Sequence, residues 1–257
     1  LGIYRMAVSI AVAPSERIST LIFRVTGPLF SGVQEDRALM RRYYLIWIEL
    51  LSITTLPLAT GLVMVASDVV LFVLGDKWAA VIAPLRWISM AAWFNTMIAL
   101  TQQVLVNLRK TKMVMKWHLA RTLAMPIAFL VGTHWELSGV AAAWLVAVPM
   151  LLLPFVVTAA RDIQLRLFEL TSTLAPSAVA SATMMVTVYL WRHYGMPPTL
   201  NTLESLATSV SVGGIAYIGV FALFFRTKFR RYIEFAKSTW IDRKHKQQEA
   251  ASNVPTC

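Results

Sequence analysis

Apolar residues along this chain fall into long runs that recur from one end to the other, separated by short polar segments. A run of about 20 mostly apolar residues is what an α-helix needs to cross about 30 Å of hydrocarbon. The pattern predicts seven membrane-spanning helices, at about residues 1–31, 44–66, 84–108, 113–132, 137–160, 172–191 and 203–225. Pro14 predicts a kink in the first span, because proline lacks the N–H that closes a helical turn.

Composition supports the same fold class, an all-α integral membrane protein. The 257 residues are 57% hydrophobic and 14% charged, whereas soluble domains average about 25% charged residues. The single cysteine, Cys257, excludes an intrachain disulfide and a cysteine-rich metal site. The four histidines are isolated from one another, so we expect no cofactor and no metal.

Basic residues set the expected orientation, because cytoplasmic loops keep the excess of lysine and arginine. Seventeen of them fall on the side that includes residues 226–257, and three, Lys77, Arg86 and Arg192, fall on the other. The basic tail 226–257 is therefore predicted to be cytoplasmic, where it would attract anionic phospholipid. The basic residues lie in clusters between apolar runs, which does not favour a nucleic-acid partner.

The first residue is placed at the outer face by this orientation. The chain starts at Leu1 without an initiator methionine or a signal-peptide pattern. We therefore expect at least one preceding span and interpret the sequence as a fragment of a longer protein.

The first span carries charges where lipid is expected. At 100° per residue, Arg17, Thr20, Arg24 and Ser31 share one stripe, and a second stripe nearby holds Arg5, Ser9 and Glu16. A charge at the bilayer centre costs about 2.5–3.5 kcal/mol or more. We expect Arg17 and Arg24 to face a bundle interior or a water-filled pathway; snorkelling to headgroups and pairing with an acid are the alternatives.

Polar residues in the next spans leave two interpretations open. Asn95 and Gln102 share a face of the third span, where they would either form interhelical hydrogen bonds or line a cavity. Glu49 in the second span would pair with Arg24 or carry a transported proton, and Glu16 is a second acid for pairing or ion coupling.

Other polar positions favour structural roles. Arg121 and His118 are interpreted as headgroup anchors near the inner end of the fourth span, and Asp68 as a solvated residue of an outer loop. Small residues four apart predict close helix packing, at Ser177 and Ser181, Ala178 and Ala182, and Ser209 and Gly213. No GxxxxGK[ST], HExxH or GxSxG motif is present, so the sequence does not predict an enzyme.

Several short motifs, in this order and spacing, resemble the polysaccharide (Wzx-like) flippase family of the multidrug/oligosaccharidyl-lipid/polysaccharide export superfamily. The resemblance runs over about residues 1–176 and rests on Leu1-Gly2-x-Tyr4, Pro14, Arg24-Val25-x-x-Pro28-x-Phe30-Ser31, Gly61-Leu62, Leu74-Gly75-x-x-Trp78 and Pro84-Leu85.

The resemblance implies the second, carboxy-terminal lobe of a two-lobe transporter of the bacterial inner membrane. Such a protein flips a polyprenyl-diphosphate-linked oligosaccharide by alternating access, for exopolysaccharide or lipopolysaccharide synthesis. Arg17 and Arg24 would then suit the diphosphate, since guanidinium groups bind phosphate oxygens in pairs, and Asn95 and Gln102 would suit sugar hydroxyls. Two other readings stay open: a cation-coupled multidrug antiporter of the same superfamily, and a non-transporting scaffold for polysaccharide assembly proteins.

Overall fold

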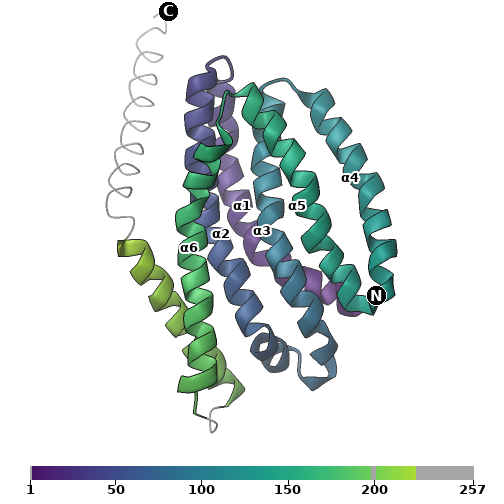
Figure 1. Ribbon diagram of the computed structural model, residues 1–257, viewed down its shortest axis with the longest axis vertical. Helices are drawn as coiled ribbons and strands as arrows, with labels where there is room; N and C mark the ends of the chain where they lie inside the picture. The colour runs from purple at the N-terminus through teal and green to yellow at the C-terminus, as the bar shows by residue number, and fades with distance from the viewer. Residues whose placement is uncertain (1, 198–200, 224–257) are drawn as a thin grey trace, which may run out of the picture. The chain divides into compact units, whose positions relative to one another are not determined.

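The described part of the chain is a bundle of long α-helices (Figure 1). The computed structural model describes residues 2–197 and 201–223, without the side chains of residues 135–138. The helices are α1 (Gly2–Gly32), α2 (Arg37–Val73), α3 (Ile82–Asn107), α4 (Thr111–Gly132), α5 (Glu136–Asp162), α6 (Leu167–Leu190) and a further helix, Thr202–Leu223. Short 3-10 turns, η1 (Asp76–Val81) and η2 (Thr133–Trp135), and a π-helical turn, η3 (Trp191–Gly195), complete the elements.

Each of the seven predicted spans overlaps one of these helices, with ends that differ by up to seven residues. Five helices within the described residues are long and apolar enough to cross a membrane: α1, α2, the 139–162 part of α5, α6 together with η3, and Thr202–Leu223. The protein is therefore a multi-pass membrane protein. The predicted tail, residues 226–257, lies outside the described residues.

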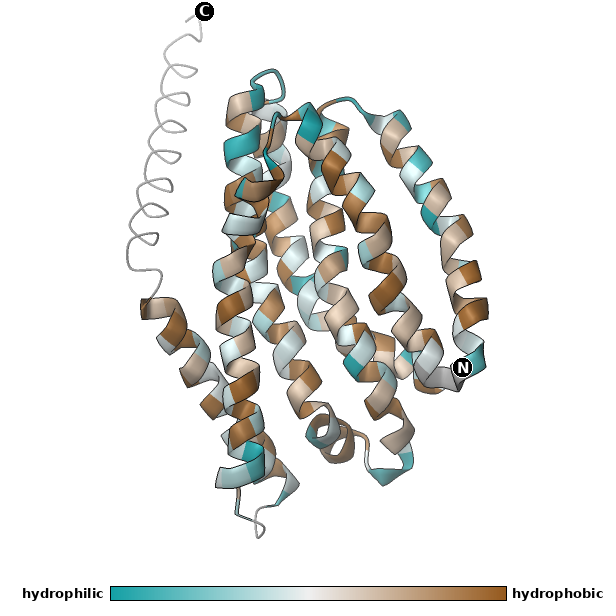
Figure 2. Cartoon of the chain, viewed as in Figure 1, coloured by the Kyte–Doolittle hydropathy of each residue, from teal (hydrophilic) through white to brown (hydrophobic). Residues whose placement is uncertain are grey.

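α3 and α4 have the length of a span but carry more polar side chains. At about 1.5 Å per residue, the 22 residues of α4 extend about 33 Å. Elsewhere hydrophobic residues cover most of the helical surface and hydrophilic residues gather near the turns (Figure 2). Polar residues in the middle of α3 and α4 therefore need a function or a partner.

Local sequence explains several helix ends. α2 starts at Arg37, seven residues before the predicted span, because Asp36 caps it by accepting a hydrogen bond from the Leu39 N–H at 3.0 Å. After α2, Gly75 adopts φ +82°, a left-handed conformation that glycine adopts without steric cost. α1 remains helical through Pro14 and bends along its course (Figure 1), as proline inside a helix causes.

α3 is the central helix of the bundle, since it packs against α1, α2, α4 and α5, while α6 packs against α2. Two hydrophobic cores hold these helices together. One core includes Phe30, Leu100 and Phe155, and the other includes Ala11, Leu85 and Ala141. The residues of α1 and α3 that lie between the two cores in sequence are partly polar.

The end of the bundle near the start of α2 is tied together by ion pairs. Arg41 on α2 pairs with Glu169 on α6. Lys110, after α3, pairs with Asp162 at the end of α5, with a nitrogen-to-oxygen distance of 2.8 Å. The first pair joins α2 to α6, and the second joins the turn between α3 and α4 to the end of α5.

The predicted small-residue packing is present at Ser177, Ser181, Ser209 and Gly213, but the prediction for Ala178 and Ala182 is wrong, because both are exposed on another side of α6. Ser177, Ser181 and Ser209 are each 1% exposed. A Cβ atom at Gly213 would stand 2.9 Å from Cγ2 of Val188 on α6, so glycine is what allows this close approach.

Candidate functional site

A cavity of about 540 Å³ lies among α1, α3, α4 and α5, at the level between the two hydrophobic cores. Its polar lining comes from Ser15, Glu16, Ser19 and Thr20 of α1, from Asn95, Thr96 and Gln102 of α3, and from Arg121 of α4; Trp144 of α5 completes one wall. Three of the predicted site residues, Glu16, Asn95 and Gln102, therefore meet in one cavity.

α1 contributes four polar residues to the cavity, two of them buried and two exposed. Ser15 and Ser19 are buried, whereas Glu16 and Thr20, one residue further on each turn, are exposed. The hydroxyl of Ser19 is buried and has no hydrogen-bond partner among the described residues. A buried polar atom without a partner is uncommon and calls for an explanation.

The amides of α3 point to α4. Asn95 Oδ1 accepts a hydrogen bond from Arg121 Nη2 at 3.0 Å, and Gln102 Oε1 lies 3.1 Å from Nε2 of His118. Both interpretations of these amides are thus realised together: they form interhelical hydrogen bonds, and they line a cavity.

The anchoring role predicted for Arg121 is wrong. Arg121 lies at the middle of α4 and lines the cavity, with its guanidinium 5.5 Å from the ring centroid of Trp117 and 6.0 Å from that of Trp144. Both contacts are within the range of cation–π attraction. The sequence held the signal, because Arg121 is also near the middle of the predicted span 113–132, where an arginine is itself a sign of function.

Arg17 and Arg24 occupy a different face of α1. Both are exposed, and neither lines the cavity. Arg5, Ser9 and Ser31 are exposed as well, so the two predicted stripes of α1 lie on one open face, whose polar part is called the polar face of α1. Leu21 and Val25 border it and are exposed too. Glu16 and Thr20 belong both to this face and to the cavity.

Glu49 is buried in α2, with 7% of its surface exposed. It is not a lining residue of the cavity, whereas Arg24 is exposed on α1. The other amide of α3, Gln103, faces α1 instead, where Oε1 accepts a hydrogen bond from the Thr26 hydroxyl at 2.7 Å. Gly27 gives Gln103 the room to approach.

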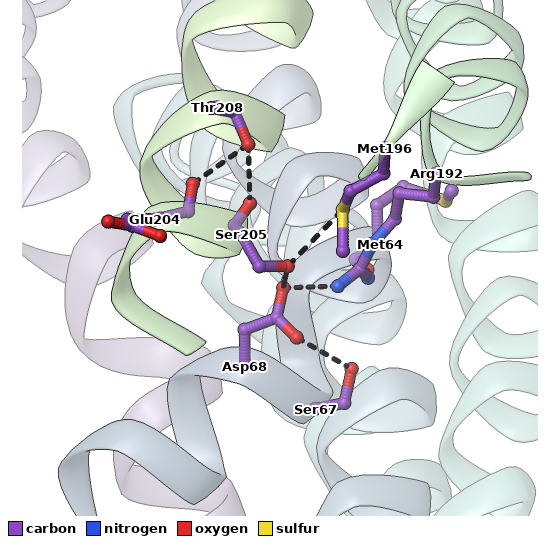
Figure 3. Close-up of polar contacts among 8 residues, drawn as sticks. All are labelled: Met64, Ser67, Asp68, Arg192, Met196, Glu204, Ser205 and Thr208. Carbon is purple, nitrogen blue, oxygen red and sulfur yellow. Dashed lines mark hydrogen bonds and ion pairs between the residues drawn. The ribbon is translucent and has the colours of Figure 1, made fainter. Parts of the chain in front are cut away.

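The interpretation of Asp68 as a solvated loop residue is wrong. Asp68 lies inside α2, is 8% exposed, and forms an ion pair with Arg192 of η3. Ser205, on the helix Thr202–Leu223, donates to the same carboxylate at 3.3 Å. Figure 3 shows these three side chains converging. α2 is longer than the hydropathy pattern predicts, and that extra length brings Asp68 back into the bundle.

A family model described as "polysaccharide biosynthesis protein" matches residues 1–83. An uncharacterized membrane protein of the cps region of Klebsiella pneumoniae is 31% identical over 91 residues, 35% of this chain and 19% of its own length. The lipopolysaccharide biosynthesis protein WzxC of Escherichia coli is 31% identical over 85 residues, 33% of this chain and 17% of its own length.

The teichuronic acid biosynthesis protein TuaB of Bacillus subtilis is 26% identical over 117 residues, which are 46% of this chain and 24% of the relative. These matches cover less than a quarter of each curated relative. They confirm the resemblance to polysaccharide flippases that the sequence motifs indicate.

Among solved structures, the lipid II flippase MurJ in an inward closed conformation has a similar fold. The TM-score is 0.70 at 15% sequence identity, and the alignment covers 89% of this chain and 48% of that one. The bundle thus has the fold of about half of a membrane flippase.

Proposed function

We propose that this chain forms one lobe of a transporter that moves a lipid-linked saccharide across the membrane by alternating access. One observation carries the proposal: α1, a helix long and apolar enough to span a membrane, exposes three arginines, Arg5, Arg17 and Arg24, on its polar face. Because an arginine in lipid is costly, such a face needs water or another polar surface beside it. A pathway between two lobes would supply both.

The charge of this face favours an anionic cargo. Arg5, Arg17 and Arg24 are three cations against one carboxylate, Glu16. Guanidinium groups bind phosphate oxygens through two parallel hydrogen bonds, which suits the diphosphate of a polyprenyl-diphosphate-linked oligosaccharide. Similarity to proteins named for lipopolysaccharide and teichuronic acid biosynthesis supports a saccharide cargo.

The remaining parts of the proposal concern placement and energy. The excess of lysine and arginine in alternate loops supports an inner-membrane protein with its carboxy terminus in the cytoplasm. Glu49, buried in α2, is the acid that could couple transport to protons. A cycle driven by the membrane potential or by substrate gradients alone needs no such group.

The test replaces Arg17 and Arg24 by glutamine together, in the gene of the source organism. We expect surface polysaccharide to fall at least tenfold, with lipid-linked oligosaccharide accumulating at the inner face of the membrane. Arg86→Gln is the matched control, because Arg86 is an exposed arginine of α3 that lies off this face, and it should leave polysaccharide unchanged.

Two other outcomes would overturn the proposal. Normal polysaccharide in a double variant that inserts at the wild-type level would favour the scaffold. Normal polysaccharide together with raised sensitivity to cationic drugs in a deletion strain would favour the multidrug antiporter.

A further inference from the structure

The cavity among α1, α3, α4 and α5 has features that phosphate binding on α1 does not use. We propose that it is a side pocket for one sugar ring of the cargo, separate from the phosphate-binding face. This inference rests on the proposed function, and it gives the lobe two subsites: cations on the open face of α1 for the diphosphate, and the cavity for a saccharide unit.

The charge of the cavity separates it from a phosphate site. Its described lining contains one cation, Arg121, and one carboxylate, Glu16. The two formal charges cancel, so a dianionic phosphate gains little there and meets the Glu16 carboxylate. A polyhydroxyl compound benefits from both groups, because a guanidinium donates hydrogen bonds and a carboxylate accepts them.

The other polar groups add directional hydrogen bonding at mid-depth in the bundle. Arg121 makes one described hydrogen bond, to Asn95, although its guanidinium has five N–H donors. Within the described residues it forms no ion pair. The Ser19 hydroxyl is 94% buried by residue surface and unpartnered. Both groups would gain a partner from a ligand with hydroxyl groups.

The shape and the walls of the cavity suit the same ligand. A volume of about 540 Å³ falls within the roughly 300–1,000 Å³ of small-molecule sites. Trp144 contributes a flat apolar ring, and an indole is a surface of this kind with a polar edge. The C–H face of a pyranose ring can lie on such a surface while its hydroxyls reach Gln102 and Arg121.

The mouth of the cavity connects it to the proposed pathway. Glu16 and Thr20 line the cavity and are exposed on the polar face of α1, on the same helix as Arg17 and Arg24. A cargo whose phosphates lie on that face could therefore place its adjoining sugar in the cavity. Arg121, Ser19 and Asn95 would then position and select the sugar rather than the phosphate.

The test measures binding to the purified full chain in detergent micelles. The probes are glucose, galactose, N-acetylglucosamine, glucuronate and inorganic pyrophosphate, and tryptophan fluorescence reports occupancy because Trp117 and Trp144 flank Arg121. We expect saturable binding of at least one monosaccharide. Arg121→Gln should weaken it tenfold or more, and Ser19→Ala about two- to tenfold, as expected for a lost neutral hydrogen bond.

Ser181→Ala is the matched control, because Ser181 is also buried and unpartnered but lies on α6 away from the cavity. It should leave sugar binding unchanged. Ser19→Ala removes a hydroxyl without a partner, so it should not lower the thermal midpoint, which keeps the comparison valid if Arg121→Gln fails to fold.

Three results would overturn the inference: no monosaccharide binds saturably, Ser181→Ala weakens binding as much as Ser19→Ala, or pyrophosphate competes with the sugar and loses its binding in Arg121→Gln. Failure of the proposed function looks different. In that case Arg17→Gln with Arg24→Gln leaves polysaccharide export normal, whatever the purified protein binds.

Discussion

Arg192 and Asp68 form an ion pair that joins the turn after α6 to the last part of α2 (Figure 3). Their side chains are 22% and 12% exposed. Arg192 also donates to the backbone carbonyl of Met64, and Asp68 accepts from Ser205. Three helical elements thus depend on one carboxylate for their mutual position.

Asp68→Asn is therefore expected to destabilise the bundle strongly. Removing one partner of a largely buried ion pair leaves the other charge uncompensated, at a cost of about 3–5 kcal/mol. Denaturant unfolding in detergent measures the loss. Lys110→Gln is the control, because Lys110 is 47% exposed in its pair with Asp162, and such pairs contribute about 0–1 kcal/mol. Equal losses in the two variants would show that the Asp68 pair is not a structural centre.

Gly213→Ala should separate α6 from the helix Thr202–Leu223. The new methyl group would lie 2.9 Å from Val188 Cγ2 and 3.5 Å from Met184 Cγ, and overpacking of this kind costs about 1–3 kcal/mol. Gly214→Ala meets nothing within 4 Å, so it should be neutral or slightly stabilising, as alanine is the better helix former. The measurement is the thermal midpoint of each variant in the same detergent. An unchanged midpoint for Gly213→Ala would contradict the close packing.

Hydrophobic runs were enough to locate the helices, because a span must be about 20 apolar residues long whatever it packs against. The runs could not say what each polar residue meets. Asp68 illustrates this, since its partners Arg192 and Ser205 are more than 120 residues away in sequence. Helical periodicity placed Asn95 and Gln102 on one face correctly, but their partners Arg121 and His118 come from a helix whose rotation the sequence does not determine.

For the same reason, only part of the candidate site could be predicted from the sequence. The stripe of Arg17 and Arg24 was visible from spacing alone, and the structure places it on an exposed face. The cavity, by contrast, depends on how four helices pack against one another, which the sequence does not give. Arg121, which lines it, was interpreted from the sequence as a headgroup anchor. An arginine half-way along a span is better interpreted by its depth, as a residue that requires a polar neighbour.

Cys257 provides a test of orientation without any substitution, because it is the single cysteine of the chain. The charge distribution predicts that it is cytoplasmic. A membrane-impermeant thiol reagent should therefore leave Cys257 unmodified in intact spheroplasts and modify it fully in inside-out vesicles. Modification in intact spheroplasts would reverse the predicted orientation, and with it the side from which the cargo enters.

Cysteine accessibility also tests whether the polar face of α1 meets water. In a Cys257→Ser background, we expect Thr20→Cys and Ser9→Cys to react with a charged thiol reagent at least tenfold faster than Val186→Cys or Ile215→Cys. All four positions are exposed on the chain, but the last two lie on apolar helix surfaces that suit lipid. The reaction requires a thiolate, and a thiolate does not form readily in hydrocarbon, so the rates report the surroundings of each position rather than simple exposure. If Thr20→Cys reacts as slowly as Val186→Cys, then α1 faces lipid or a dry protein contact, and a hydrated pathway along Arg17 and Arg24 is excluded.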